Sequence, residues 1–264
     1  MIENRACAGF AEFQACVQLQ LDTWGYDSRE MLPRKGFQLA SLIGGQVFGA
    51  FDTDLPLGPS GSHAAQMIGY AMAMSGIKSH PGAQPTPYLH SHMLAVLPAY
   101  RNQGLGARLK HAQRLEALSR GITHMEWTFD PLEIKNSYLN LVKLGATVRE
   151  YRENFYGPSQ SRLQAGLPTD RLLAVWQMDS PRVEAALAGR PAAAFTVEKR
   201  IELPAAIYEW KASESEQDHA RALDVLLRNR ALFQEAFRQG LAILGFRRDT
   251  DSNGIFELGY PHTA

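Results

Sequence analysis

The sequence predicts an α/β protein with a mixed, mainly antiparallel sheet flanked by helices, and three observations indicate this class. Helical periodicity comes first, a series of strand-like segments separated by breaker-rich loops comes next, and helices and strands then alternate. The chain has 264 residues, of which 45% are hydrophobic, enough for a well-buried core. We expect a core domain in residues 1–157 and an α+β extension that continues the sheet in residues 158–264.

The first part of the chain supplies helices and a run of antiparallel strands. After a short opening strand, apolar residues recur every three or four positions over residues 10–24, the spacing of one helical face, and a shorter helix is expected over 33–42. Strands are expected over 46–52 and 67–74, joined as a hairpin by a loop rich in glycine and proline. A strand over 88–96 should continue this sheet.

Helices and strands alternate in the next part. An apolar stripe predicts a helix over 105–118, and a strand over 124–129 follows it. A helix over 132–144 and a strand over 146–151 complete the expected core domain. The extension is expected to contain strands over 172–178 and 195–203, a long helix over 218–239, and terminal strands over 241–247 and 255–258.

Composition excludes some partners. Lys plus Arg and Asp plus Glu are both 27, so no strong net field favours nucleic acid or an anionic membrane. The first residues lack a basic segment followed by an apolar run, and no stretch approaches the roughly 20 apolar residues that span a bilayer. We therefore expect a cytoplasmic protein that binds neither nucleic acid nor membrane. Cys7 and Cys16 fit no zinc or disulfide pattern, and we expect them to be small core residues.

One segment carries a recognisable chemistry. Residues 94–109 read as the end of a strand, a loop with two glycines and the start of a helix. The first turn of a helix has backbone N–H groups without intrahelical partners and the positive end of the helix dipole, so it can wrap a pyrophosphate. Gly104 and Gly106 permit close backbone approach, and Arg101 can add a charge-assisted contact.

Other glycine-loop sites fit this segment poorly. A Rossmann fingerprint needs a third glycine, but Leu109 occupies that place, and the preceding strand belongs to an antiparallel series. A Walker loop needs Gly-Lys followed by Ser or Thr, which this segment lacks.

The segment resembles the signature of the GNAT superfamily of N-acetyltransferases, Arg/Gln-x-x-Gly-x-Gly/Ala after a Val-x-Pro strand end. Arg101, Gly104 and Gly106 match it, with Val96 and Pro98 in the matching places. The resemblance implies an acyl-CoA co-substrate, acetyl-CoA or another acyl-CoA, and no metal. It assigns the pantetheine arm to Leu94 and Val96, whose amide would polarise the thioester. It assigns the pyrophosphate to Arg101, Asn102, Gln103, Gly104, Leu105 and Gly106.

Further blocks resemble a long-chain, poorly characterised branch of predicted acetyltransferases in this superfamily. They are His90 to Met93, Trp127 to Leu132, Asn154 to Gly157 and Gly166 to Arg171. Similarity to this branch implies N-succinylation of amino acids as a possible activity. The extension resembles, more weakly, a partial second unit of the same kind.

One departure concerns the acid that protonates the leaving thiolate. Many relatives carry a tyrosine at the place that Leu141 occupies here. Tyr138 and Asn136 lie three and five residues earlier, so the usual acid does not transfer directly. Asn136 is expected to reach coenzyme A, and Tyr138 to contact substrate.

Several residues are candidates for proton transfer or substrate binding, each with a structural alternative. His90 and His92 alternate on one strand, so we expect them to share a face, with His92 catalytic and His90 contacting substrate. The alternative is that these histidines are structural and satisfied by neighbouring hydrogen bonds. Glu126 is a second candidate base, and a surface carboxylate is the alternative. Asp130 is either catalytic or an N-cap before Pro131.

Two later residues complete the set. Tyr156 either protonates the thiolate or packs under the sheet, and packing is favoured. Arg171 either binds a carboxylate of the donor or acceptor, or forms an ion pair with Asp170 or another neighbour.

The function expected is direct acyl transfer from acyl-CoA to the primary amine of a small molecule such as an amino acid, in a ternary complex and without a covalent enzyme intermediate. A homodimer is possible. Two rivals stay open: a CoA-binding module without turnover, and a metal-dependent hydrolase that uses His90 and His92.

Overall fold

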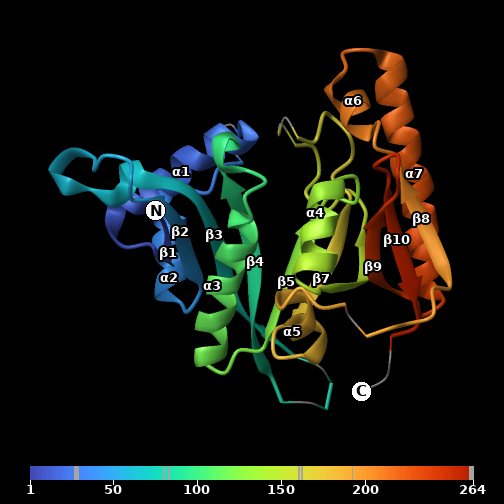
Figure 1. Ribbon diagram of the computed structural model, residues 1–264, viewed down its shortest axis with the longest axis horizontal. Helices are drawn as coiled ribbons and strands as arrows, with labels where there is room; N and C mark the ends of the chain where they lie inside the picture. The colour runs from blue at the N-terminus through green and yellow to red at the C-terminus, as the bar shows by residue number, and fades with distance from the viewer. Residues whose placement is uncertain are drawn as a thin grey trace. The chain divides into compact units, whose positions relative to one another are not determined.

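The computed structural model describes residues 1–26, 30–79, 81–82, 84–159, 161, 163–191 and 193–261. The chain divides into two compact units, Met1–Glu126 and Trp127–Ala264, and each is described by itself (Figure 1). The mixed α/β class expected from the sequence is confirmed. The positions outside this description lie between or beyond the helices and strands expected from the sequence.

A mostly antiparallel sheet forms the first unit. Its strands lie in the order β1-β2-β3-β4-β5. Each of the first three pairs antiparallel with the next, whereas β4 and β5 pair in parallel. The strands span β1 Ile2–Ala6, β2 Gln46–Asp52, β3 Met67–Lys78, β4 Thr86–Val96 and β5 His124–Phe129, of which the last runs on into the second unit.

Helices cover both faces of this sheet. α1 Gly9–Trp24 and α2 Arg34–Leu42 pack on one face through a core that includes Phe13, Phe37 and Phe51. α3 Leu105–Ser119 packs on the other face, where Leu105 and Leu109 are buried (Figure 1). Cys7 and Cys16 are buried free thiols, as expected.

The pairing of β3 with β4 is irregular near the two strand histidines. Met72 lies opposite Met93 while Ala73 lies opposite Ser91, so His92 is an extra residue in β4. Such a bulge interrupts the alternation of side chains along a strand. The expectation that His90 and His92 share one face stays a prediction; His90 is close enough for its charge to lower the pKa of His92.

The second unit contains a larger set of strands. Their order is β5-β7-β6-β9-β10-β8, and the pairs β7–β6, β6–β9, β9–β10 and β10–β8 are antiparallel. These strands span β6 Thr147–Arg152, β7 Arg171–Gln177, β8 Lys199–Leu203, β9 Ala242–Arg248 and β10 Gly254–Gly259.

The helices of the second unit differ from expectation in two places. The helix predicted over 132–144 consists of α4 Ile134–Tyr138 followed by a π-helical segment, η4 Leu139–Lys143. A short helix, α6 Ile207–Ala212, was not expected; it precedes the long α7 Glu216–Arg238, which was. α5 Pro181–Leu187 lies between the strands predicted over 172–178 and 195–203, and the second of these, β8, begins at Lys199, four residues later than predicted.

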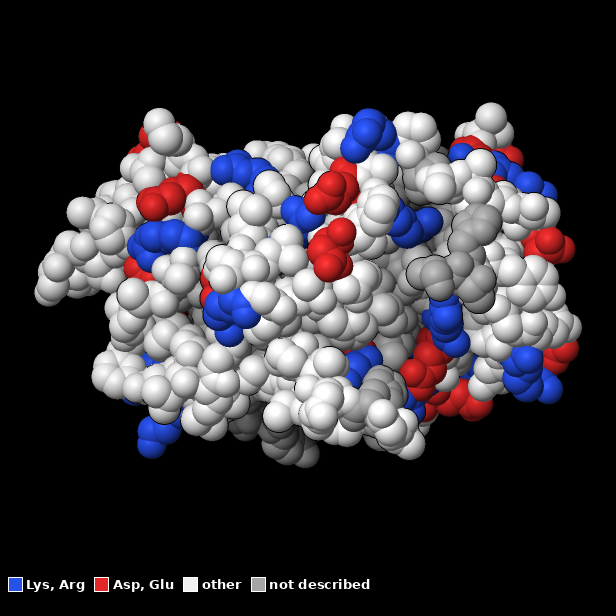
Figure 2. All heavy atoms as spheres, turned by 90° about the horizontal axis from the view of Figure 1, so that it is seen from below, with Lys and Arg blue, Asp and Glu red and all other residues white. Residues whose placement is uncertain are grey.

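Two surface properties bear on partners. On the face shown in Figure 2, Lys and Arg side chains are interspersed with Asp and Glu, in keeping with equal numbers of both kinds. Within the described ranges, no helix is both long and apolar enough to cross a bilayer.

Candidate active site

The loop between β4 and α3 has the backbone conformation that an anion-binding turn needs. It starts with a short 3-10 turn, η3 Pro98–Tyr100, and reaches α3 through Arg101 to Gly104, all exposed. Asn102 and Gly104 have φ values of 63° and 78°, in the left-handed region. A Cβ added at Gly104 would meet no atom within 4 Å, so glycine is favoured here by φ rather than by lack of space. Gly106 has no such requirement, because it lies inside α3 and its φ is not positive.

Backbone amides at this turn point out of the helix without acceptors. Gly104 is the N-cap of α3 and offers no side chain, and the first helical hydrogen bond is donated by Arg108 to Gly104. For the N–H groups of residues 102–107, the described part of the chain provides no acceptor. The positive end of the helix dipole adds to their attraction for an anion.

Two hydrogen bonds hold the loop against the strands. The hydroxyl of Tyr100 donates to Asp52 Oδ2 at 2.8 Å, which lowers the pKa of Asp52 and raises that of Tyr100. Arg101 Nε donates to the carbonyl of Val96 at 2.9 Å. Arg101 therefore lies at the end of β4 in this structure.

The edge of β4 beyond the bulge is open. The N–H of Leu97 donates to Ile68 in β3, so the backbone groups of Val96 point to the opposite edge. Strand β5 pairs with β4 only at Leu89 and His90 among the described residues. The main chain of Leu94 and Val96 is thus available on that edge, apart from the Arg101 contact with Val96.

Polar side chains from three strands gather near the point where β4 and β5 pair. Glu126 accepts hydrogen bonds from Lys78 Nζ and from His124 Nε2, the second at 3.4 Å. The ring of Tyr88 lies edge-on to His124, with centroids 6.0 Å apart. His90 lies directly opposite Glu126 in the strand register.

These contacts fix the ionisation of the cluster. Burial raises the pKa of Glu126, but the hydrogen bonds and charges of His124 and Lys78 outweigh it and bring the pKa to about 2. Burial lowers the pKa of His90, aided by Lys110 and Lys78 and opposed by Glu126. The surrounding protein also lowers the pKa of His92, whose side chain still reaches solvent. At neutral pH, Glu126 is an anion and both histidines are neutral.

Lys110 is a buried amine that the sequence analysis did not single out. It reaches from α3 to Ser91 in β4, where Nζ donates to Oγ at 2.5 Å, and it lies 3.8 Å from Met125 Sδ. Burial lowers its pKa to about 7. The side of α3 that buries Lys110 also carries the polar residues Gln113 and Arg114, so the apolar pattern of the sequence does not mark it.

In the second unit, Asp130 makes the contacts of a structural residue. Its Oδ1 accepts from the N–H of Leu132 at 2.8 Å, and its Oδ2 is 3.2 Å from Lys211 Nζ. Lys211 also binds Glu133 at 2.9 Å, and its side chain is only 7% exposed. This pattern supports a capping role for Asp130. The N–H group that it caps, that of Leu132, belongs to the turn before α4, whereas the N-cap residue of α4 itself is Glu133.

Asn136, Tyr138 and Leu141 lie in α4 and η4, the helical segments that follow β5. Asn136 accepts a long hydrogen bond from Asn140, and the ring of Tyr138 is flanked by Lys143 and Arg248 at 5.8 and 5.7 Å. Leu141 is 3% exposed, so the place of the usual tyrosine is part of the core.

Tyr156 is exposed rather than packed under the sheet. Its side chain is 48% exposed, and its hydroxyl shares a 2.8 Å hydrogen bond with Thr128 in β5. The preference for a packed Tyr156 was therefore wrong, since its loop presents the ring to solvent.

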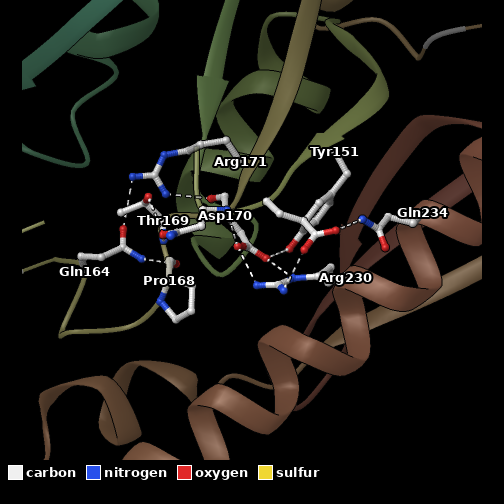
Figure 3. Close-up of polar contacts among 10 residues, drawn as sticks. Tyr151, Gln164, Pro168, Thr169, Asp170, Arg171, Arg230 and Gln234 are labelled. Carbon is white, nitrogen blue, oxygen red and sulfur yellow. Dashed lines mark hydrogen bonds and ion pairs between the residues drawn. The ribbon is translucent and has the colours of Figure 1, made fainter. Parts of the chain in front are cut away.

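Arg171 does not pair with the carboxylate of Asp170 (Figure 3). That carboxylate binds Arg230 of α7, with Nε at 2.7 Å from Oδ2, while Arg171 donates to the main-chain oxygen of Asp170 at 2.8 Å. The alternative role of Arg171, an ion pair with Asp170, is thus not observed: Asp170 pairs instead with Arg230, 60 positions further along the chain. Sequence reasoning missed Arg230 because nothing in its local pattern indicates a long-range partner.

A metal site was one of the alternatives for His90 and His92. The described residues contain no group of three or more His, Cys, Asp or Glu side chains that could hold a metal ion.

Comparison with known proteins defines the class of protein. Residues 44–135 match the model of the Acetyltransferase (GNAT) family. This stretch holds β2 to β5, α3 and the whole loop between β4 and α3. It belongs to the GNAT superfamily, and the chain is an N-acyltransferase. No curated protein sequence matches the chain.

Solved structures show the same fold. NAA60 of Arabidopsis thaliana, in complex with acetyl-CoA, has 14% identity and a TM-score of 0.55, covering 68% of this chain and 100% of that one. The same protein with a bisubstrate analogue gives 17% identity and a TM-score of 0.51, covering 67% and 98%. A putative acetyltransferase of Acinetobacter baylyi gives 14% identity and a TM-score of 0.50, covering 69% and 94%. At these identities the likeness shows the GNAT fold.

Proposed function

We propose that the protein transfers an acyl group, acetyl or succinyl, from acyl-CoA to the primary amine of a small molecule such as an amino acid. The observation that carries this proposal is the row of unpartnered amides at residues 102–107, next to the open edge of β4. A homodimer and a cytoplasmic location stay predictions that accompany it.

The loop and the strand edge suit the two parts of coenzyme A. The pyrophosphate binds the amides of Asn102 to Gly106 at the N-terminus of α3, and the pantetheine arm pairs with the backbone of Leu94 and Val96. Arg101 must release the Val96 carbonyl for the arm to pair there, and its guanidinium is then free for the pyrophosphate. The solved NAA60 complex with acetyl-CoA supports a donor of this kind on this fold.

The reaction needs a neutral amine held close to the thioester. The amine nitrogen attacks the carbonyl carbon, a C–N bond forms, the C–S bond breaks, and coenzyme A leaves as a thiolate that takes up a proton. An α-amine with a pKa near ~7.8 is neutral about one time in seven at pH 7, whereas a lysine amine near ~10.4 is neutral about once in ~2,500. An α-amine acceptor therefore needs only a modest base.

The ionisation of the strand residues favours His92 over Glu126 as that base. A general base works best when its pKa is near the operating pH. Glu126, with a pKa of about 2 and Lys78 bound to it, is a weak acceptor. His92 is neutral, reaches solvent and lies in the bulge two residues before Leu94. His90 then contributes to the acceptor pocket beside Glu126.

Other expected roles keep their place in the proposal. Tyr156 is available as an acid because its hydroxyl is exposed beside Thr128. Asn136 and Tyr138 are each partly exposed on α4, where Asn136 would contact coenzyme A and Tyr138 the substrate. Asp130 has a structural role in this proposal, because it caps the turn before α4.

Gly104→Glu tests the loop directly. A glutamate there places a negative charge beside the proposed pyrophosphate site and strains a left-handed residue by about 1–2 kcal/mol. We expect acyl-CoA affinity, measured by calorimetry, to fall by roughly 100-fold or more from charge repulsion and lost contacts.

Gly121→Glu is the matched control, because Gly121 follows the other end of α3 with φ 74° and equally open space. It carries the same strain and charge and should leave acyl-CoA affinity unchanged. Equal affinity for all three proteins contradicts the loop assignment.

The rival expectation, a CoA-binding module without turnover, is not favoured by the family match, although Leu141 is buried in the place of the usual acid. Release of free CoA with a panel of D- and L-amino acids, with products identified by mass spectrometry, separates it from the enzyme. A metal-dependent hydrolase would lose its activity to a chelator, and the acyltransferase would not.

A further inference from the structure

The carboxylate of Asp170 is fully occupied, which leaves its neighbour Arg171 without an acidic partner in the part of the chain that the structure describes. Asp170 is 1% exposed. Its Oδ2 accepts from the Tyr151 hydroxyl at 2.6 Å and from Arg230 Nε at 2.7 Å. Its Oδ1 accepts from Arg230 Nη2 and from the N–H of Asn154, both at 2.9 Å.

Arg171 is held in place by neutral groups alone. Nη1 donates to the Asp170 carbonyl at 2.8 Å, and Nη2 donates to Gln164 Oε1 at 3.2 Å. Gln164 is itself fixed, since it is 4% exposed and its Nε2 donates to the carbonyl of Pro168 at 2.7 Å. In Figure 3 the guanidinium of Arg171 extends toward Gln164, while the carboxylate of Asp170 faces Arg230 and Tyr151. Within the described residues, no carboxylate forms an ion pair with Arg171.

An aromatic wall stands beside this cation. The ring of Tyr156 has its centroid 5.3 Å from Arg171 Cζ, and Phe155 lies edge-on to Tyr156 at 4.7 Å. Both rings are exposed, at 48% and 45%. The hydroxyl of Tyr156 is fixed by Thr128, which follows Glu126 by two residues in β5.

We propose that Arg171 binds a carboxylate of a substrate, with the ring of Tyr156 as the wall of this subsite. A guanidinium has five N–H donors, and two are used here, so enough remain for a bidentate contact with a carboxylate. The single positive charge of one guanidinium matches the single negative charge of a carboxylate better than the nearly two negative charges of a phosphate group. The inference rests on the proposed acyl transfer, which it deepens by naming the chemistry of the substrate.

The carboxylate has two possible sources in that reaction. It belongs either to the acceptor, as the α-carboxylate of an amino acid, or to a dicarboxylic acyl chain such as succinyl. Both place the same group on Arg171, and the choice of substrates distinguishes them.

The test compares wild type with Arg171→Gln in steady-state CoA release. Acetyl-CoA is paired with amino acids and with the amines that their decarboxylation gives, and succinyl-CoA is paired with the same amines. We expect Arg171→Gln to raise KM roughly 10- to 100-fold for the carboxylate-bearing substrate only, since hydrogen bonds to charged groups are lost. A rise for amino acids identifies the acceptor as the source, and a rise for succinyl-CoA identifies the donor.

Two variants control for folding and for charge. Arg171→Lys keeps the charge but loses the planar fork, and we expect an intermediate KM. Arg149→Gln removes an exposed cation from β6 and should change no KM. Circular dichroism and acetyl-CoA affinity of Arg171→Gln should match the wild type.

The outcome is decided by binding as well as by turnover. Calorimetry measures carboxylate recognition directly, with N-acetyl amino acids, the matching N-acetyl amines and succinyl-CoA as ligands. If no substrate pair releases CoA, the acyl transfer is refuted, but these binding measurements still test the role of Arg171. Equal binding of carboxylated and decarboxylated ligands to the wild type overturns the inference. It is also overturned if Arg171→Gln weakens every ligand alike, or weakens coenzyme A alone.

Discussion

Glu126 and His92 show how the contacts of single residues assign chemistry. Both were candidate bases by residue type, yet Lys78 and His124 bring the pKa of Glu126 to about 2, while the surroundings of His92 keep its imidazole neutral. A group that is already an anion with a strong donor gains little by taking a proton. The pH dependence of the reaction should therefore follow a histidine.

His92→Gln tests this at the residue scale. The wild-type kcat/KM should fall as pH decreases, because the amine becomes protonated, and should fall more steeply below the lowered pKa of His92, under its ordinary value of about 6.5. His92→Gln should lower kcat/KM roughly 100-fold or more and remove the steeper limb.

Glu126→Gln serves as the comparison, and it should keep the steeper limb. A steeper limb that survives in His92→Gln and disappears in Glu126→Gln would assign the base to the carboxylate instead.

Lys110 adds a second ionisable group beside the strand histidines. With a pKa of about 7, it carries a partial charge at neutral pH, and that charge lowers the pKa of His90. The contact with Ser91 places this amine next to the β4 bulge. The pKa of His90 is thus raised by the negative charge of Glu126 and lowered by the positive charge of Lys110.

At the scale of elements, α7 holds the segment that carries Tyr156 and Arg171. Arg230 in α7 binds Asp170 and also Glu153, at 3.0 Å, so one side chain joins the helix to both ends of this segment. The long segment from 153 to 170 also contains left-handed residues at Asn154 and Ala165, which its fixed ends must support.

Arg230→Ala should destabilise the second unit strongly. It leaves the buried carboxylate of Asp170 without its cation, a loss of about 3–5 kcal/mol for a pair of this kind. Urea denaturation gives the free energy of unfolding, and hydrogen exchange should show faster opening of residues 153–170.

Arg221→Ala is the control on the same helix. Arg221 pairs with Asp218 at the surface, with 51% of its side chain exposed, so the free energy of unfolding should change by less than about 1 kcal/mol. Equal effects of the two substitutions would show that Arg230 has no special role.

The π-helical segment η4 is an element that the sequence pattern did not reveal. It follows α4 directly, and within it Leu141 is buried. A helix that widens in this way shifts which side chains face outward, and π-helical turns are frequent at functional sites. It offers a physical reason why the usual tyrosine cannot be transferred by counting along the helix.

At the scale of the whole molecule, the chain divides into compact units between Glu126 and Trp127. The sequence predicted a domain boundary between residues 157 and 158. In the structure, β6 pairs with β7 and β9, both beyond that predicted boundary. The residues that the family model matches, 44–135, span parts of both units.

A chain that ends at residue 157 should not fold cooperatively. It lacks the partners of β6 and leaves the backbone groups of that strand unpaired. Urea denaturation followed by circular dichroism should give a broad transition, and a dye for apolar surfaces should bind, unlike with the full chain. A sharp transition would support residues 1–157 as an autonomous domain.

The sequence by itself determined the class of fold, the strand–loop–helix turn and the chemistry of its amides, because periodicity and glycine positions are local properties. The turn lies within the stretch that matches the GNAT family, and most helices and strands lie close to their expected ranges. Local patterns were enough because helix starts and backbone dihedrals depend on near neighbours.

Only the tertiary structure decided which polar and charged groups meet. The pairs Lys78–Glu126, Lys110–Ser91 and Asp170–Arg230 join residues 48, 19 and 60 positions apart. The bulge at His92 and the π-helical η4 also depend on packing against other elements. Burial and long-range contacts set the ionisation of His92, Glu126 and Lys110 and left Arg171 without an acidic partner among the described residues, and no local pattern encodes them.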